Sequence, residues 1–337
     1  MNETLRPMTL GEILDRTVQL YRRNFLSFAG ISAVPTATML IVLLPAIGLL
    51  VIPGIAQKHG APMNGTLATL LAVIVVVAIL VAIATTVFSQ TALIRAAISA
   101  YTGEGLRIRE AFSSVRPSFW RFFGTLVLQA IWIGLIPAVI AGVVIAVLLA
   151  LAQAAGGSLG ANAVTGFLAF VIGAAAVVII ILRALTYSLT MPACVAEARP
   201  AWESLQRSKK LSRGTRGRIF VMFLLIWALA AVVSMIGYVP TMIVVILTAM
   251  SSNRATPTAI LFVAAQIINV LVDFAMQTLI TPVYMIALVL FYYDQRIRTE
   301  GYDIEWMMQR AGLAAGGPQS GLEPAPNQVA ETGTIDG

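Results

Sequence analysis

Six long stretches of apolar residues alternate along the chain with shorter segments that carry most of the polar and charged residues. Each apolar stretch exceeds the roughly 20 residues that an α-helix needs to cross the hydrocarbon core of a bilayer. Because a chain in lipid must satisfy its backbone hydrogen bonds internally, each stretch is predicted to be a transmembrane helix. The predicted spans are residues 26–52, 67–99, 122–151, 164–193, 218–250 and 258–292.

A short amphipathic segment precedes each pair of predicted spans. The segments are residues 9–25, 106–121 and 200–217, in which aromatic and aliphatic residues recur every three or four positions among arginines and acidic residues. In the first segment, Thr9 and Glu12 have the spacing of a capping box, which predicts a helix start. Amphipathic helices with basic polar faces lie in the headgroup plane of a bilayer. Two interpretations remain open: these helices bind or sense lipids, or they only anchor the chain.

The three amphipathic segments also share a short motif. Gly11–Arg16, Arg109–Phe112 and Trp202–Leu205 each have a glutamate at the second position, and each leads into a stretch rich in arginine and aromatic residues. We therefore predict an all-α membrane domain over residues 1–310, built from three repeated units. Each unit comprises an interfacial helix and a pair of transmembrane helices, all in the same orientation.

Residues 311–337 differ from the rest of the chain. They are rich in Gly, Pro, Ala, Gln and Thr and contain no basic residue. Such a composition predicts a disordered tail, which the topology places in the cytoplasm. The tail is either a docking peptide or a simple extension.

Composition indicates a membrane protein and excludes an ordinary soluble domain. Of the 337 residues, 59% are hydrophobic and 11% are charged, whereas soluble domains carry about 25% charged residues. Mean hydropathy is +0.89. The net charge is +7, and 19 of the 22 basic residues lie before the first span, or in or close beside the connections that follow the second, fourth and sixth spans. The positive-inside rule therefore predicts a multi-pass protein with both termini in the cytoplasm.

Arginines beside hydrophobic spans favour anionic lipid headgroups as partners, and not nucleic acid. A membrane or cytoplasmic protein is a second candidate partner for the same face. The residues expected to contact headgroups are Arg22, Arg23, Arg121, Arg216 and Arg218.

Two charged residues lie deep inside predicted spans, Arg183 in the fourth and Asp273 in the sixth. A lone charge at the centre of a bilayer costs about 2.5–3.5 kcal/mol on insertion scales, so a paired arrangement is favoured. The pair is a candidate ion or proton relay, or a structural ion pair that fixes helix register. In a third interpretation the two residues do not meet, and Arg183 reaches the inner interface.

The sequence offers little for catalysis. Its one cysteine, Cys194, lies in an apolar run and is expected to pack in the interior, and its one histidine, His59, lies in a predicted outside loop. The metalloprotease and P-loop motifs do not occur in the sequence. No catalytic residue, metal site or cofactor is predicted.

Three strings resemble a known family: Thr9–Arg16 with Tyr21–Phe25, Ser208–Gly214, and Tyr292–Arg298 followed by Glu300–Glu305. They are similar to the membrane domain attached to some bacterial glycerophosphoryl diester phosphodiesterases, which also occurs as a stand-alone membrane protein. The resemblance implies the inner membrane of a bacterium. In those enzymes hydrolysis belongs to a separate soluble barrel with histidine and carboxylate metal ligands, which this sequence lacks.

These observations predict a non-enzymatic integral membrane protein that engages anionic lipids or a partner protein at the cytoplasmic face. The alternative is a small-solute transporter or channel that uses Arg183 and Asp273. An enzyme acting on lipids within the membrane would need a nucleophile or metal cluster that the sequence does not supply.

Overall fold

The computed structural model describes residues 7–38, 40–41, 65–103, 108–154, 156, 159–250 and 255–301. These residues form helices and no strand, so the all-α prediction is confirmed for the described part of the chain. The elements are α1 (Leu10–Arg23), an unlabelled helix (Phe25–Thr38), α3 (Gly65–Thr102), α4 (Ile108–Val115), a 3₁₀ turn (Arg116–Ser118), α5 (Phe119–Ala130), a π-helical turn (Ile131–Leu135), α6 (Ile136–Ala154), α7 (Leu159–Tyr187), α8 (Thr190–Glu197), α9 (Ala201–Leu211), α10 (Arg216–Met250) and α11 (Ala255–Glu300).

Five helical segments are long and apolar enough to cross a bilayer, as expected of a multi-pass membrane protein. They are Ala72–Thr102, Ile108–Ala154, Asn162–Glu197, Arg216–Val239 and Ile267–Glu300. The first predicted span, 26–52, is described only through the shorter apolar helix Phe25–Thr38 and two further residues. The rest of that span and the predicted tail, 311–337, lie outside the described residues.

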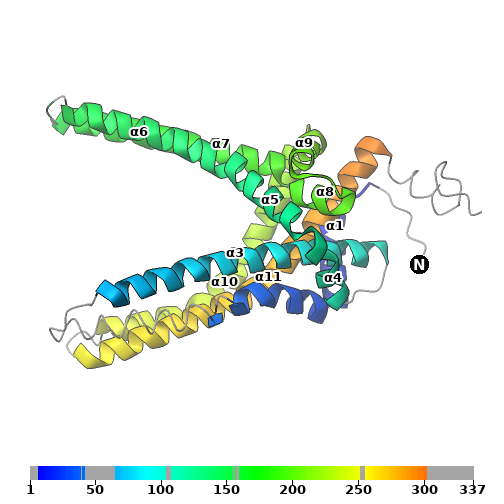
Figure 1. Cartoon of the computed structure of the whole chain (residues 1–337), viewed down its shortest axis with the longest axis horizontal. Coiled ribbons are helices and arrows are strands. Elements are labelled where there is room, and N and C mark those ends of the chain that lie inside the picture. The colour runs from blue at the N-terminus through cyan, green and yellow to red at the C-terminus, as the bar shows by residue number, and fades with distance from the viewer. Residues whose placement is uncertain are drawn as a thin grey trace, which may run out of the picture.

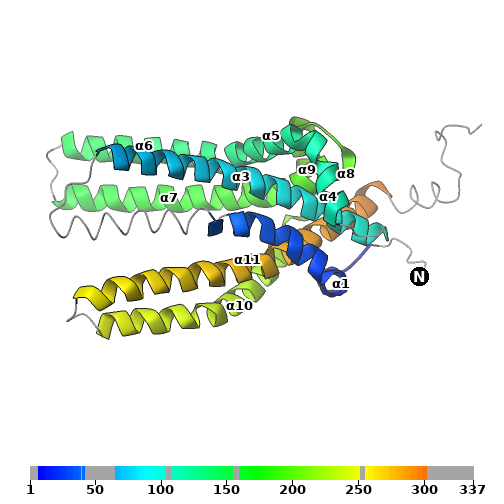
Figure 2. The ribbon, with the colours of Figure 1, turned by 60° about the horizontal axis from the view of Figure 1, so that its bottom comes forward.

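The helices converge at one end of the molecule, where α1, α4, α8 and α9 surround the C-terminal part of α11 (Figure 1). We call this region the packed end. From it, the α6–α7 hairpin runs in one direction, while α3, α10 and α11 run in another, so that the two groups diverge in Figure 1. Figure 2 shows the α10–α11 hairpin separated from α6 and α7 along most of its length.

Side chains are buried mainly at the packed end and exposed along the diverging helices. The hydrophobic core lies at the packed end and includes Leu93 and Ile94 of α3, Phe122 of α5, and Phe291 and Tyr292 of α11, each exposed by 1% or less. The α6–α7 hairpin is apolar but turns its side chains outward, with Phe167 66% and Phe170 72% exposed. Helices of this kind suit a hydrocarbon solvent, because lipid replaces a protein neighbour.

Two predicted spans are not continuous α-helices, and a proline accounts for each interruption. The predicted span 164–193 breaks after Tyr187 and resumes as α8 at Thr190. Pro192 lacks an N–H, and its ring would clash with the carbonyl of residue 188 in an unbroken helix. Between α5 and α6, just before Pro137, the helix widens into a π-helical turn in which the Ile136 N–H bonds to the Ile131 carbonyl.

The first amphipathic helix begins as the sequence predicts. The Thr9 hydroxyl accepts the N–H of Glu12, and the Glu12 carboxylate accepts the N–H of Thr9, which completes the capping box. The face of α1 in contact with the protein is centred on Ile13, Thr17 and Leu20. Val18, an apolar residue beside this face, is 46% exposed. α1 therefore packs along α11 and still presents apolar side chains outward.

Candidate functional site

The break between α7 and α8 is closed by two serines of α9. The carbonyl of Thr186 would have lost its helical partner at the break, but it accepts hydrogen bonds from the hydroxyls of Ser208 at 2.9 Å and Ser212 at 3.0 Å. Ser208 also accepts the backbone N–H of Leu189 at 3.2 Å. Both serines are fully buried. The Ser208–Gly214 string therefore joins α9 to the end of α7.

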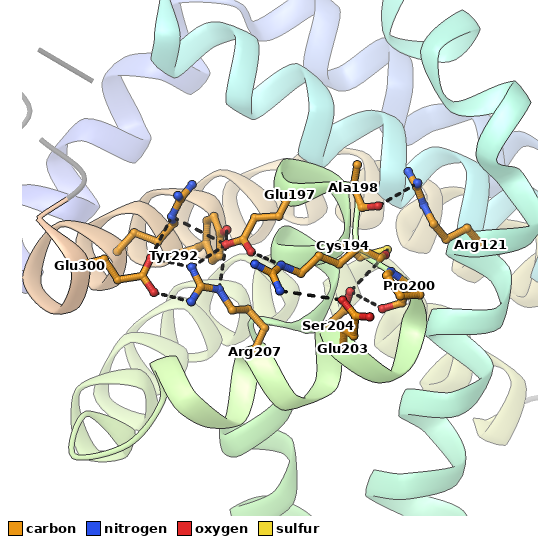
Figure 3. Close-up of polar contacts among 12 residues, drawn as sticks. Arg121, Cys194, Glu197, Ala198, Pro200, Glu203, Ser204, Arg207, Tyr292 and Glu300 are labelled. Atoms are coloured by element: carbon orange, nitrogen blue, oxygen red, sulfur yellow. Dashed lines mark hydrogen bonds and ion pairs between the residues drawn. The ribbon is translucent and has the colours of Figure 1, made fainter. Parts of the chain in front are cut away.

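Glu197, the last residue of α8, lies at the centre of an ionic cluster (Figure 3). Its carboxylate accepts the hydroxyl of Tyr292 at 2.6 Å and is paired with Arg207 at 2.9 Å. It also accepts the Nε–H of Arg199 at 2.6 Å. Together these contacts connect α8, α9 and α11, although Tyr292 is 95 residues from Glu197 in the sequence.

Arg207 bridges two carboxylates in this cluster. One side of its guanidinium meets Glu197, and the other donates two hydrogen bonds to Glu300, of which the Nη2–Oε2 bond is 2.6 Å long. Burial lowers the pKa of Arg207, but the hydrogen bonds and charges of Glu300 and Glu197 outweigh that effect, so its pKa is raised above the ordinary value. Arg207 therefore stays charged at every physiological pH. Arg296 lies between the same two carboxylates.

A second charged group fixes the beginning of α1 to α11. Asp294 is completely buried and accepts the backbone N–H of Met8 at 2.8 Å. Its carboxylate is paired with Arg298 at 3.0 Å and with Arg218 of α10 at 3.2 Å. Both arginines also donate to the carbonyl of Met8. Residues from the two ends of the described chain thus lie in contact at the packed end.

The structure divides the five arginines predicted to contact headgroups into two sets. Arg218 is held by the buried carboxylate of Asp294. Arg121 donates to the carbonyl of Ala198 at 3.1 Å and lies over the ring of Phe122. Ala198 has a φ of 53°, so this contact supports a left-handed residue at the end of α8. These two arginines therefore have internal structural roles.

The other three arginines, Arg22, Arg23 and Arg216, are exposed and have no ion pair within the described residues. Sequence reasoning missed five further basic residues of similar character. Three of them, Lys209, Lys210 and Arg213, are exposed in the stretch from the last turn of α9 to the start of α10, which also contains Arg216. We call Lys209, Lys210, Arg213 and Arg216 the basic turn. The other two are Arg109 in α4 and Arg116 in the 3₁₀ turn after α4.

Arg183 and Asp273 have different partners and form no ion pair in the part of the chain that the structure describes. Arg183 donates to the carbonyl of Trp132 at 2.7 Å and lies over its ring at 5.5 Å. Asp273 accepts the hydroxyl of Tyr238 at 2.9 Å, on the α10–α11 hairpin. The structure thus corresponds to the third interpretation of these charges, in which the two residues do not meet.

The chain matches no protein-family model, no curated protein and no solved structure. The resemblance to the membrane domain of bacterial glycerophosphoryl diester phosphodiesterases therefore stays a prediction that rests on three short strings. The function of the chain has to be inferred from the geometry of its described residues.

Proposed function

We propose that the chain is a non-enzymatic protein of a bacterial inner membrane whose packed end lies at the cytoplasmic face and binds anionic lipid headgroups. The observation that carries this proposal is the division of the basic residues. Arg121, Arg207 and Arg218 are held by carboxylates or a carbonyl of the protein, whereas the basic turn and Arg22 and Arg23 are exposed without such partners among the described residues.

The position of the chain ends supports the predicted topology. Met8, before α1, contacts Arg298, near the end of α11. A membrane chain whose two ends meet in this way crosses the bilayer an even number of times, which supports six spans in three helix pairs. The three short helices α1, α4 and α9 gather at the same end (Figure 1). With the positive-inside rule, this end is the cytoplasmic one.

The basic turn is well suited to an anionic leaflet. Its four cations lie within eight residues that contain no acidic residue. Trp202, in the first turn of α9, is 51% exposed, and tryptophan prefers the interface between hydrocarbon and water. Each basic residue close to an anionic surface contributes about 1 kcal/mol, screened by salt. The basic turn therefore enriches anionic lipid around the protein.

The protein's own tryptophans permit a direct test. Wild type and a variant with K209Q, K210Q, R213Q and R216Q are reconstituted in phosphatidylcholine that contains brominated phosphatidylglycerol, and tryptophan quenching gives the relative association of the two lipids. We expect the wild type to prefer phosphatidylglycerol, with a preference that falls as salt is added. The variant should lose most of that preference.

A charge-conserving variant, K209R, K210R, R213K and R216K, is the matched control and should retain the wild-type preference. Long-range attraction to an anionic leaflet depends on the charge of each side chain, and Lys and Arg contribute about equally to it. Equal preference for phosphatidylglycerol in the wild type and the glutamine variant would refute the proposal.

A further inference from the structure

The contact between Arg183 and Trp132 arises from an irregularity in the backbone. In the π-helical turn, the N–H of Ile136 bonds to the carbonyl of Ile131 instead of that of Trp132. The next residue, Pro137, has no N–H to offer. The Trp132 carbonyl is therefore left without a helical donor, and Arg183 of α7 supplies one at 2.7 Å. This bond explains the position of the side chain but uses one of the five N–H groups of its guanidinium.

The charge of Arg183 is not balanced by the surrounding helices. Residues 119–187, which include α5, α6 and α7, contain no aspartate or glutamate. Arg183 has no ion pair within the described ranges, whereas Arg207 and Arg218 each face a buried carboxylate. A cation in a predicted membrane span without a counter-charge is unfavourable. An anion from outside the chain would remove this imbalance.

An aromatic cluster centred on Trp132 lies on the protein side of the guanidinium. The ring of Trp132 lies beneath it, and the ring of Trp202 meets that of Trp132 edge-on at a centroid distance of 5.8 Å. The indole N–H of Trp132 donates to the hydroxyl oxygen of Tyr187 at 2.9 Å, which leaves the hydroxyl hydrogen of Tyr187 to donate elsewhere. Tyr187 is one helical turn from Arg183, so both donors lie on one face of α7.

The same face continues as an apolar surface toward the far end of α7. Ile179, one turn before Arg183, is 46% exposed, and Leu135 beside the π-helical turn is 55% exposed. Trp202 lies at the start of α9, at the packed end. A ligand at Arg183 would thus have its anionic group near the interface and an apolar chain along α7.

We propose that Arg183, assisted by the hydroxyl of Tyr187, binds the phosphate of a phospholipid from the leaflet at the packed end. The guanidinium supplies paired, charge-assisted N–H donors that match two phosphate oxygens. This inference rests on the proposed lipid-binding function but names a different kind of site. It holds one lipid by its phosphate and is shared by zwitterionic and anionic phospholipids, whereas the basic turn selects by net charge.

Native mass spectrometry of the detergent-solubilised, delipidated full chain tests the site by titration with phosphatidylglycerol or phosphatidylethanolamine. We expect one tightly bound phospholipid of either class on the wild type, with little dependence on salt. The R183Q variant should bind it about tenfold more weakly, because a charge-assisted contact is lost. R183K keeps the charge but not the fork of donors and should bind with intermediate affinity. Y187F removes the second donor and should also weaken binding.

The outcomes separate this site from the basic turn and from a site for soluble anions. The basic-turn glutamine variant should retain the tightly bound lipid, and R183Q should retain the preference for phosphatidylglycerol in bilayers. If R183Q fails to fold, R183K and Y187F decide the matter. Unchanged affinity in the folded variants would overturn the proposal. Displacement of the lipid by millimolar inorganic phosphate would also overturn it, since the site would then take a free anion.

Discussion

The hydroxyl of Ser208 donates to the carbonyl of Thr186 at 2.9 Å, and this contact replaces a helical hydrogen bond that the break before Pro192 removes. Ser212 donates to the same carbonyl, so that one acceptor receives two buried donors. The break allows α8 to turn into the packed end and brings Glu197 to α11. The interruption between α7 and α8 is thus stabilised by two serines of α9, the next helix in the sequence.

Replacement of both serines should destabilise the packed end. In S208A/S212A, the buried carbonyl of Thr186 loses both donors, and an unsatisfied buried group costs about 1–3 kcal/mol. Cys194 is the only cysteine of the chain and is fully buried. Its reaction with a fluorescent maleimide during heating therefore reports the unfolding of this region, and the midpoint should fall by several degrees.

Ser113 provides the control for the serine variant. Its hydroxyl bonds to the carbonyl of Glu110 on the exposed face of α4. The S113A variant should shift the midpoint very little, as exposed substitutions change stability by about 0.5 kcal/mol or less. Equal effects of S113A and S208A/S212A would contradict the assigned role of the α9 serines.

Removal of the Glu197 charge should have a larger effect than removal of the Tyr292 hydroxyl. The E197Q variant leaves the half-buried Arg207 with only Glu300 and removes one ionic contact of Arg199. Loss of one partner of a fully buried ion pair costs about 3–5 kcal/mol, which sets an upper limit for this partly buried pair. The Y292F variant removes one hydrogen bond to a charged group, at about 1.5–3 kcal/mol. The temperature at the midpoint of Cys194 labelling should be highest for the wild type, lower for Y292F and lowest for E197Q. A lower midpoint for Y292F than for E197Q would count against a central role for Glu197.

Asp294 should determine whether the beginning of α1 stays attached. In D294N the interaction with the N–H of Met8 and the two arginines is weakened. Limited proteolysis should then cleave before or within α1 at least several-fold faster than in wild type, while the rest of the chain remains protected. Asp15, on the exposed face of α1, bonds only to Gln19 among the described residues and supplies the control variant D15N. Equal cleavage of D294N and wild type would exclude this anchor.

Hydropathy and local motifs predicted the helical class, most span positions and the capping box of Thr9 and Glu12, because each depends on residues close together in the sequence. The partners of the charged residues depend instead on long-range packing. Arg218 meets Asp294, 76 positions away, and nothing in its local sequence distinguishes it from the exposed Arg216. The sequence therefore identified a basic face but not the arginines that remain available on it. The three-unit repeat and the lipid role stay predictions.

The close approach of α10 and α11 depends on Gly237. A Cβ at this position would lie 3.0 Å from Cγ1 of Val272 and 3.1 Å from Cε of Met276, both on α11. Small residues allow helix backbones in a membrane to approach closely, and dispersion then stabilises the pair. The adjacent Tyr238 bonds to Asp273 only while the two helices keep this separation.

The G237V variant should push the helices apart and cost about 1–3 kcal/mol, the usual penalty for overpacking. Gly217, in the first turn of the same helix, has no atom within 4 Å of an added Cβ, so G217V controls for the change in helix propensity alone. A cysteine pair at Tyr238 and Asp273, introduced after replacement of Cys194 by serine, should react with a short bifunctional thiol crosslinker, and G237V should slow this crosslinking. Rapid crosslinking in the presence of G237V, or equal loss of stability in G217V, would show that Gly237 does not set the spacing of α10 and α11.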